Sequence, residues 1–224
     1  MDEGLFSWER FLSVPIVGIL RNIPIEDVAH ILPLYLKAGL TTVEITMDTP
    51  HAETIIRYAL DQYSKKLNIG AGTVCNLSDL NRAREAGAQF IVTPIIDEQV
   101  INACVRGQLP IFPGAYTPSE IYRAWALGAS MVKVFPAAAL GANYIRELGG
   151  PLKQIKLLPT GGINLDNCLK FLEAGAAGLG IGGQLFDKQI IENKNWEALT
   201  EHFEKFVKKI QTQKYLEKPD KIFG

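Results

Sequence analysis

The sequence predicts an α/β fold in which strands and helices alternate along the whole chain. Apolar, β-rich runs recur, and each is followed by a helical pattern that ends at a glycine or a turn. Four such endings, at Gly39, Gly87, Gly128 and Gly175, lie 48, 41 and 47 residues apart. A repeated strand and helix unit of this kind indicates a parallel sheet covered by helices.

Eight segments have the composition of strands, so the 224 residues average 28 per unit. Eight units of about this size favour a single closed (β/α)8 barrel of the TIM type, and an open doubly wound sheet is the alternative. The predicted strands cover residues 14–20, 41–47, 68–74, 89–94, 109–114, 131–136, 155–161 and 177–182.

The two ends of the chain carry their own signals. Within an N-terminal segment 1–13, residues 6–12 form an amphipathic pattern with Ser7 as N-cap, and we expect this helix to plug the bottom of the barrel. The first barrel helix is predicted from Pro24 to Ala38, and the last, over 196–211, closes the ring. Residues 214–224 are expected to form a loosely held tail.

Composition points to an ordinary soluble domain that handles small molecules. Hydrophobic residues make up 47% of the chain and charged residues 21%, and 23 basic residues balance 24 acidic ones. No basic block favours a nucleic-acid or membrane partner. Three separated cysteines and an opening Met-Asp-Glu-Gly without a signal-peptide pattern predict a cytoplasmic location.

The segment 131–136 places a lysine inside the predicted barrel. In a strand, Val132 and Val134 share one face, which suits packing against helices, while Lys133 and Phe135 face the other way. Burial penalises the ammonium and lowers the pKa of Lys133. A neutral amine of this kind can attack a carbonyl to form a Schiff base.

The second predicted strand carries a matching carboxylate. Glu44, Thr46 and Asp48 alternate with apolar residues and so point inward. Alternate strands contribute to the same interior layer of a barrel, so Glu44 on strand two can lie near Lys133 on strand six. The pair is either a structural ion pair or a general acid/base beside an amine nucleophile.

Other candidates lie at the carboxyl ends of predicted strands. The runs Thr160-Gly161-Gly162 and Gly182-Gly183-Gln184 follow strands seven and eight, where barrels often bind phosphate through backbone N–H groups. Tight turns would need the same glycines. Thr73 and Arg21, after strands three and one, are candidates to hold a carboxylate.

Two further groups of residues are weaker candidates. Lys156 also lies in an apolar run, but towards the amino-terminal end of its strand, where barrel residues usually serve stability. His30, His51 and His202 have no ligand-like spacing, so no metal site is predicted, and His51 is expected to be a surface residue.

Together these segments resemble the family of 2-keto-3-deoxy-6-phosphogluconate and 4-hydroxy-2-oxoglutarate aldolases, including its 6-phosphogalactonate branch, from about Val14 to Phe186. The shared motifs are Val-Glu-Ile-Thr at 43–46, Gly-Ala-Gly-Thr-Val at 70–74, Ile-Val-Thr-Pro at 91–94, Pro-Gly at 113–114, Val-Lys-Val-Phe-Pro at 132–136, Pro-Thr-Gly-Gly at 159–162 and Ile-Gly-Gly at 181–183.

The resemblance implies a class I aldolase without metal or cofactor, built as one barrel domain over residues 1–224 and assembled as a homotrimer. It implies that a 2-keto-3-deoxy-6-phospho sugar acid is cleaved to pyruvate and glyceraldehyde 3-phosphate, or 4-hydroxy-2-oxoglutarate to pyruvate and glyoxylate. By position, Lys133 matches the Schiff-base lysine and Glu44 the general acid/base. Thr73 and Pro94 match residues that line the pocket near the pyruvyl group, and Phe135 matches its apolar wall. The residues that match the phosphate-binding loops are Thr160, Gly161, Gly162, Gly182 and Gly183.

The chain departs from this pattern at two positions. Asp48 stands where the phosphogluconate enzymes carry an arginine and the galactonate branch an asparagine, so Arg21 and Thr73 are expected to hold the carboxylate. Gln184 replaces a smaller hydroxyl residue after the last glycine pair. A phosphate-binding barrel isomerase or synthase, and a non-catalytic sugar-phosphate binding barrel, are the alternative functions.

Overall fold

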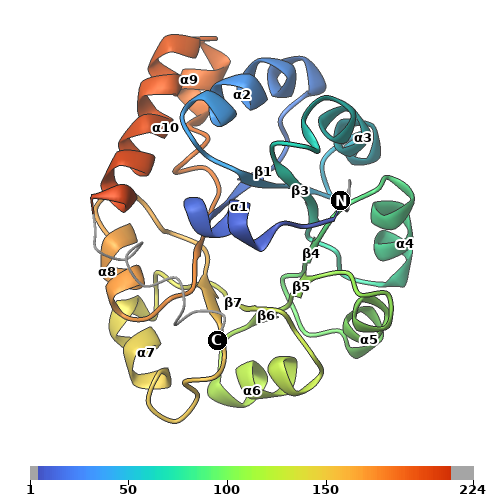
Figure 1. Ribbon diagram of the computed structural model, residues 1–224, viewed down its shortest axis with the longest axis vertical. Helices are drawn as coiled ribbons and strands as arrows, with labels where there is room; N and C mark the ends of the chain where they lie inside the picture. Colours follow the sequence, from blue (N-terminus) through green and yellow to red (C-terminus); the bar gives the residue numbers. More distant parts are fainter. Residues whose placement is uncertain (1–4, 213–224) are drawn as a thin grey trace.

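The computed structural model describes residues 5–212, and the predicted α/β fold with parallel strands is confirmed (Figure 1). The predicted tail, residues 214–224, lies outside the described residues, as do residues 1–4 and 213. The strands are β1 (Ile16–Leu20), β2 (Thr42–Thr46), β3 (Asn68–Gly72), β4 (Ile91–Val92), β5 (Ile111–Phe112), β6 (Gly114–Ala115), β7 (Val132–Val134), β8 (Leu157–Pro159) and β9 (Leu179–Ile181).

The strands are paired in parallel in the order β5-β4-β3-β2-β1-β9 and, separately, β6-β7-β8. A single parallel bridge between Thr160 and Gly180 connects the ends of β8 and β9. The result is a strongly curled sheet whose carboxyl ends all lie on one side.

The fifth predicted strand differs from the expectation because it is broken into β5 and β6 at Pro113. Proline has no N–H to donate to a sheet ladder, so the regular pairing stops there. Its carbonyl still accepts a hydrogen bond of 2.8 Å from the backbone N–H of Lys133, which keeps the two short strands beside β7.

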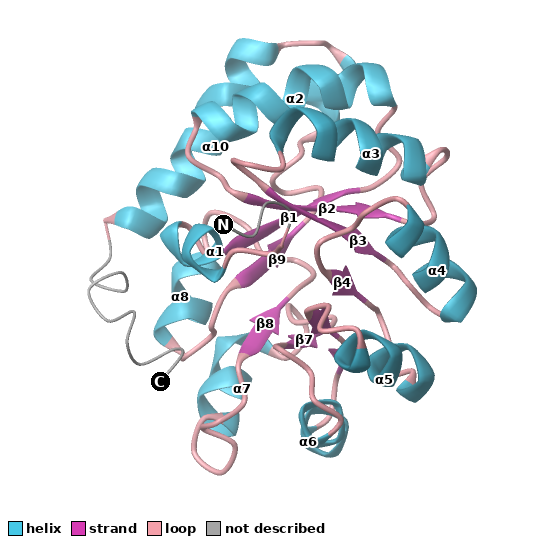
Figure 2. Cartoon of the chain, turned by 45° about the vertical axis from the view of Figure 1, so that its right-hand side comes forward, coloured by secondary structure: helices cyan, strands magenta, loops and turns pink. Residues whose placement is uncertain are grey.

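Apart from the N-terminal helix, helices lie around the outside of the strands (Figures 1 and 2). The four predicted helix endings are confirmed, since Gly39, Gly87, Gly128 and Gly175 have φ of 96°, 92°, 97° and 101°, a left-handed conformation that glycine adopts without strain. The helices are α1 (Trp8–Ser13), α2 (Ile25–Lys37), α3 (Ala52–Tyr63), α4 (Leu77–Glu85), α5 (Glu98–Arg106), α6 (Pro118–Ala126), α7 (Gly141–Leu148), α8 (Cys168–Glu173), α9 (Lys188–Glu192) and α10 (Trp196–Gln211).

Strand alternation divides the apolar residues into two clusters. The larger one fills the layer between strands and helices and includes Val43, Val132 and Val134. The smaller one lies inside the curl of the sheet and includes Phe90, Phe112, Met131 and Leu158. Lys133 lies between Val132 and Val134, so its side chain continues the inner row that Met131 begins.

The helix α1 packs at the amino-terminal ends of the strands. Ser7 caps it, because its side chain accepts a hydrogen bond from the backbone N–H of Arg10. Phe11, fully buried, belongs to the inner apolar cluster, as does Phe6 just before the helix. Asn68 at the start of β3 accepts from the N–H of Ser7 and donates to its carbonyl, both at 2.8 Å, and so ties α1 to the sheet.

The last helix, α10, packs against α2. Among the described residues, none of the helices combines the length and the apolar character needed to cross a lipid bilayer.

Candidate active site

Lys133 and Glu44 lie inside the curled sheet, buried near the carboxyl ends of β7 and β2. Lys133 is 5% exposed and Glu44 is 1% exposed. The two side chains interact electrostatically although they come from strands far apart in the sequence. The structure therefore brings together the lysine and the carboxylate that strand alternation places on the inner face.

The surroundings of Lys133 favour a neutral amine. Burial is the main cause that lowers its pKa; Glu44 acts in the opposite direction, and the positive charge of Arg21 lowers the pKa further. The Lys133 Nζ atom lies 5.0 Å from the centre of the Phe135 ring. Phe135 is 40% exposed, so an exposed aromatic ring lies next to the buried amine.

Glu44 is poised to exchange a proton near neutral pH. Burial raises its pKa to about 7, against the lowering effect of Lys133 and Arg21, and the nearby negative charge of Asp48 adds to the rise. Among the described residues, its Oε2 atom is buried and has no hydrogen-bond partner. A buried acceptor in that state is available to a reacting group.

Gly72 makes room for this carboxylate, and sequence reasoning did not assign it a role. A Cβ atom on Gly72 would lie 2.6 Å from the carboxyl carbon of Glu44. Only glycine permits so close an approach of a side chain to the backbone. For the run Ala71-Gly72-Thr73 the sequence predicts a role for Thr73 but none for Gly72.

Arg21 is held at the opening of the site by two partners. Its Nη1 donates to Asp48 Oδ2 at 3.0 Å, and its Nη2 donates to Thr73 Oγ1 at 2.8 Å. The Arg21 and Asp48 side chains are 51% and 43% exposed. The sequence grouped Arg21 with Thr73 but missed Asp48 as their third member. The available signal was that all three follow the ends of adjacent parallel strands.

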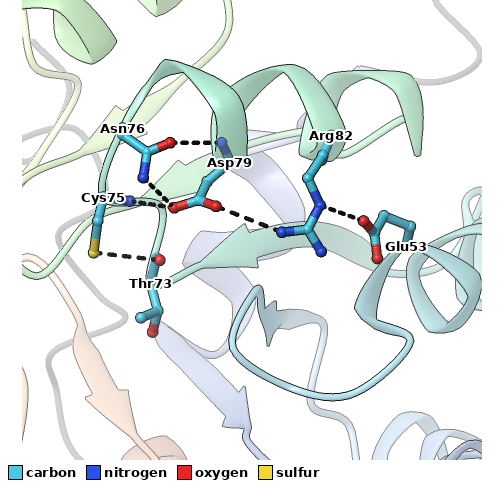
Figure 3. A network of polar contacts seen from close by, with 6 residues as sticks. All are labelled: Glu53, Thr73, Cys75, Asn76, Asp79 and Arg82. Carbon is cyan, nitrogen blue, oxygen red and sulfur yellow. Dashed lines mark hydrogen bonds and ion pairs between the residues drawn. The ribbon is translucent and has the colours of Figure 1, made fainter.

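The loop after β3 holds Thr73 in an unusual backbone conformation. Its φ is +56°, in the left-handed region that a β-branched residue rarely adopts. The Cys75 thiol donates to the Thr73 carbonyl at 3.5 Å, and the Cys75 N–H donates to Asp79 Oδ2 at 3.2 Å (Figure 3). Asp79 in α4 therefore fixes the loop that presents Thr73.

Asp79 is in turn connected to the neighbouring loop (Figure 3). Arg82 lies 3.5 Å from Asp79 and, through Nε, 2.5 Å from Glu53 in the first turn of α3. Since α3 follows the loop that carries Asp48, this Glu53–Arg82–Asp79 relay joins the two loops that hold Arg21.

The loop after β8 exposes backbone donors. The Thr160 side chain is buried against Gly180, and its hydroxyl donates to the Leu158 carbonyl at 3.1 Å. Gly161 and Gly162 have φ of 91° and 73°. Within the described residues, the Gly162 N–H donates to no protein acceptor, so it is suited to bind an anion.

The loop after β9 borders a cavity of about 720 Å³ that extends between β1 and α9. Gly182 and Gly183 line it together with Arg21 and Lys188. A side chain on Gly183 would meet no atom within 4 Å, so the backbone there is open to a ligand. The exposed Gln184 is tied to α10, because its carbonyl lies 2.8 Å from His202 Nε2.

The remaining candidates lie in different parts of the fold. Pro94 lies with its backbone against Gly114, the residue that pairs with Lys133 across the β6–β7 ladder. Lys156 lies at the other end of the sheet, with its Nζ 5.9 Å from the centre of the Trp8 ring. Exposed His51 precedes α3. No cluster of three or more potential metal ligands occurs among the described residues.

A buried lysine of lowered pKa beside a carboxyl group of raised pKa, at the carboxyl ends of parallel strands, defines a class of enzyme that can act through an amine nucleophile.

Comparison with known proteins narrows this class. The family model "KDPG and KHG aldolase" matches residues 9–202. A 2-dehydro-3-deoxy-6-phosphogalactonate aldolase of Escherichia coli strain K12 is 36% identical over 182 residues, which are 80% of this chain and 87% of the relative.

Two solved structures have the same fold. One, described as native KDPGal, superposes with a TM-score of 0.84 at 30% identity and covers 92% of this chain and 97% of its own. The other is KDPG aldolase of Legionella pneumophila with pyruvate captured as a covalent carbinolamine intermediate. Its TM-score is 0.81 at 28% identity, with 87% and 95% of the chains covered. The chain belongs to the KDPG and KHG aldolase family and is an aldehyde-lyase.

Proposed function

We propose that this protein is a class I, Schiff-base aldolase that reversibly cleaves a 2-keto-3-deoxy-6-phospho sugar acid to pyruvate and glyceraldehyde 3-phosphate. It also cleaves 4-hydroxy-2-oxoglutarate to pyruvate and glyoxylate. The observation that carries the proposal is the buried Lys133 beside the buried Glu44, whose Oε2 has no hydrogen-bond partner among the described residues.

Lys133 is the nucleophile. Its neutral amine adds to the C2 ketone, and loss of water gives an iminium that withdraws electrons from the C3–C4 bond. Glu44 takes the proton of the C4 hydroxyl as that bond breaks and the aldehyde leaves. The enamine left on Lys133 is protonated at C3, and water hydrolyses the imine to release pyruvate. A carboxyl group with a pKa of about 7 can accept and return this proton near neutral pH.

Arg21 and Thr73 bind the carboxylate of the substrate. Arginine presents five N–H donors, of which Asp48 and Thr73 engage two, and the Thr73 hydroxyl that accepts from Arg21 can donate its own hydrogen. Phe135 and Pro94 line the pocket around the pyruvyl group.

The glycine loops bind the distal phosphate. Its donors are the Gly162 N–H and the backbone of Gly182, Gly183 and Gln184. Gly161 and Thr160 shape the first of these loops, and the Thr160 N–H itself donates to the Val134 carbonyl at 2.9 Å. No cofactor or metal takes part.

We further propose that residues 1–224 are one domain, a closed (β/α)8 TIM barrel with α1 covering its amino-terminal end. The bridge between Thr160 and Gly180 and the Pro113 carbonyl bonded to Lys133 N–H support closure of the ring. The protein acts as a homotrimer in the cytoplasm on small molecules, with no nucleic-acid or membrane partner. The three cysteines, all free in the structure, suit a reducing compartment. Light scattering of the purified protein tests the trimer.

The decisive experiment traps the imine. The protein is incubated with pyruvate and borohydride, its intact mass is measured, and the modified peptide is mapped. We expect one reduced pyruvyl adduct on Lys133, no adduct in Lys133→Met, and a normal adduct in the matched control Lys156→Met.

A folded protein that forms no adduct would contradict the aldolase mechanism. That result would favour a phosphate-binding isomerase or synthase, or a non-catalytic sugar-phosphate binding protein, both of which use the glycine loops without a covalent lysine. The family match and the carbinolamine reported for the Legionella relative support the aldolase instead.

A further inference from the structure

At the opening of the site, the Arg21 guanidinium is shared between two hydrogen-bond partners. One of its nitrogens is bonded to the charged Asp48 and the other to the neutral Thr73. Asp48 accepts this hydrogen bond through its Oδ2 atom, and the Asp48 side chain is 43% exposed. A carboxylate bound by Arg21 therefore lies close to Asp48, whose negative charge already offsets part of the positive charge of Arg21.

Two effects of Asp48 on a bound carboxylate oppose each other. The ion pair orients the Arg21 guanidinium, which favours binding. The negative charge of Asp48 repels the incoming carboxylate across a short distance, which weakens binding. An asparagine would keep an oxygen that accepts from Arg21 and would remove only the charge, so the two effects can be separated.

We infer that Asp48 is a specificity-determining residue, which orients Arg21 through its oxygen while its charge weakens the binding of substrates that carry a carboxylate. The inference rests on the proposed role of Arg21 and Thr73 in binding that carboxylate. It goes beyond that role, because it assigns Asp48 a function and predicts which ligands are affected.

The same charge reaches the reacting groups. Glu44 is faced by Lys133 from β7, Arg21 from the end of β1 and Asp48 from the end of β2, and Asp48 helps to raise the pKa of Glu44. Lys133 is faced in addition by Cys75 from the loop after β3. Removing the charge of Asp48 should therefore lower the pKa of Glu44 and extend activity to lower pH.

The test compares a charged and a neutral ligand. Imine trapping with borohydride measures the concentration that gives half-maximal adduct for pyruvate and for its neutral analogue pyruvamide, in the wild type, Asp48→Asn and Asp48→Ala. In Asp48→Asn we expect the half-maximal concentration of pyruvate to fall about 2- to 5-fold, and to fall by less at high salt. The half-maximal concentration of pyruvamide should not change. Asp48→Ala should gain less, because Arg21 loses a partner.

Asp61→Asn is the matched control, since it removes a charge of the same sign at the far end of α3 and should leave the half-maximal concentrations of both ligands unchanged. An unchanged or weaker pyruvate affinity in Asp48→Asn, or an equal gain for pyruvamide, would overturn the inference. So would an acidic limb of the pH–rate profile that stays in place. A wild type that forms no adduct with either ligand would instead reject the proposed function.

Discussion

At the scale of single residues, the chemistry depends on two buried groups whose pKa values are moved towards each other. The pKa of Glu44 is raised to about 7 and that of Lys133 is lowered, in both cases mainly by burial. Such a pair favours the uncharged amine and keeps the carboxyl group ready to change its protonation state near neutral pH, which is what imine formation and proton transfer require.

Replacing Glu44 should affect cleavage and imine formation differently. The base form of Glu44 is needed to take the C4 proton, so wild-type kcat should rise with pH through about 7. In Glu44→Gln we expect this limb to disappear and kcat to fall by roughly 10²- to 10⁴-fold, while borohydride still traps pyruvate on Lys133. A Glu44→Gln protein with normal turnover would remove Glu44 from this role.

The same carboxyl group should also change how stability depends on pH. Because burial raises its pKa from 4.5 to about 7, the folded state holds the proton over a range in which the unfolded state releases it. Glu44 therefore costs stability as pH rises from 4.5 to about 7, by about 3 kcal/mol in total, and the cost stays constant above that range.

Urea unfolding of the wild type and Glu44→Gln across this pH range checks the sign. The variant should gain stability relative to the wild type as pH rises, whatever the constant cost of burying the glutamine amide. A difference in free energy of unfolding that stays flat from pH 4.5 to 7 would contradict the raised pKa.

At the scale of elements, neighbouring loops hold Arg21. The relay Glu53–Arg82–Asp79 connects α3 with the loop after β3, and Asp79 accepts the N–H of Cys75 (Figure 3). In Asp79→Ala we expect half-maximal imine formation to need about 2- to 5-fold more pyruvate, because one hydrogen bond that holds the Thr73 loop is lost. Cys75 should also react faster with iodoacetamide.

Two controls distinguish positioning from a general loss of charge. Asp79→Asn keeps an oxygen that can accept from Cys75, so its effect should be smaller. Glu98→Ala breaks a comparable exposed ion pair, with Arg123 at 2.6 Å, and should leave pyruvate binding unchanged. Equal effects of Asp79→Ala and Glu98→Ala would show that the relay has no special role.

Gly72 in β3 contributes to the site because it has no side chain. Since a Cβ atom on Gly72 would crowd the Glu44 carboxyl group, Gly72→Ala should displace that group. We expect kcat to fall at least about tenfold while the imine on Lys133 still forms. Gly175→Ala, at a helix end where a Cβ atom meets nothing within 4 Å, is the control for cost to folding alone. Wild-type kcat in Gly72→Ala would show that Glu44 tolerates the methyl group.

At the scale of the whole molecule, stability and reactivity occupy opposite ends of the sheet. The fully buried Phe11 packs α1 into the inner cluster below Lys133. Phe11→Ala should lower the free energy of unfolding by about 3–5 kcal/mol, measured by urea unfolding, while the folded fraction still forms the pyruvate adduct normally. Glu9→Ala, on the exposed face of α1, should cost little. A large change in pyruvate affinity in folded Phe11→Ala would contradict this separation.

The sequence by itself determined the alternation of strands and helices, the four helix endings and the inward direction of Lys133 and Glu44. These follow from local rules: a strand alternates every second residue, and a helix often ends at a left-handed glycine. The break at Pro113 also follows from a local rule, because proline has no N–H to donate to a sheet ladder.

Only the tertiary structure decided how the site is assembled. Arg21, Asp48 and Thr73 come within hydrogen-bond distance because β1, β2 and β3 are neighbours, and no local pattern fixes such a distance. The pKa of Glu44 depends on burial by the whole sheet together with the charges of Lys133 and Arg21 from two other segments and of Asp48 at the end of its own strand. Local backbone preferences act over a few residues, whereas desolvation and electrostatic interactions are sums over everything that the fold brings near.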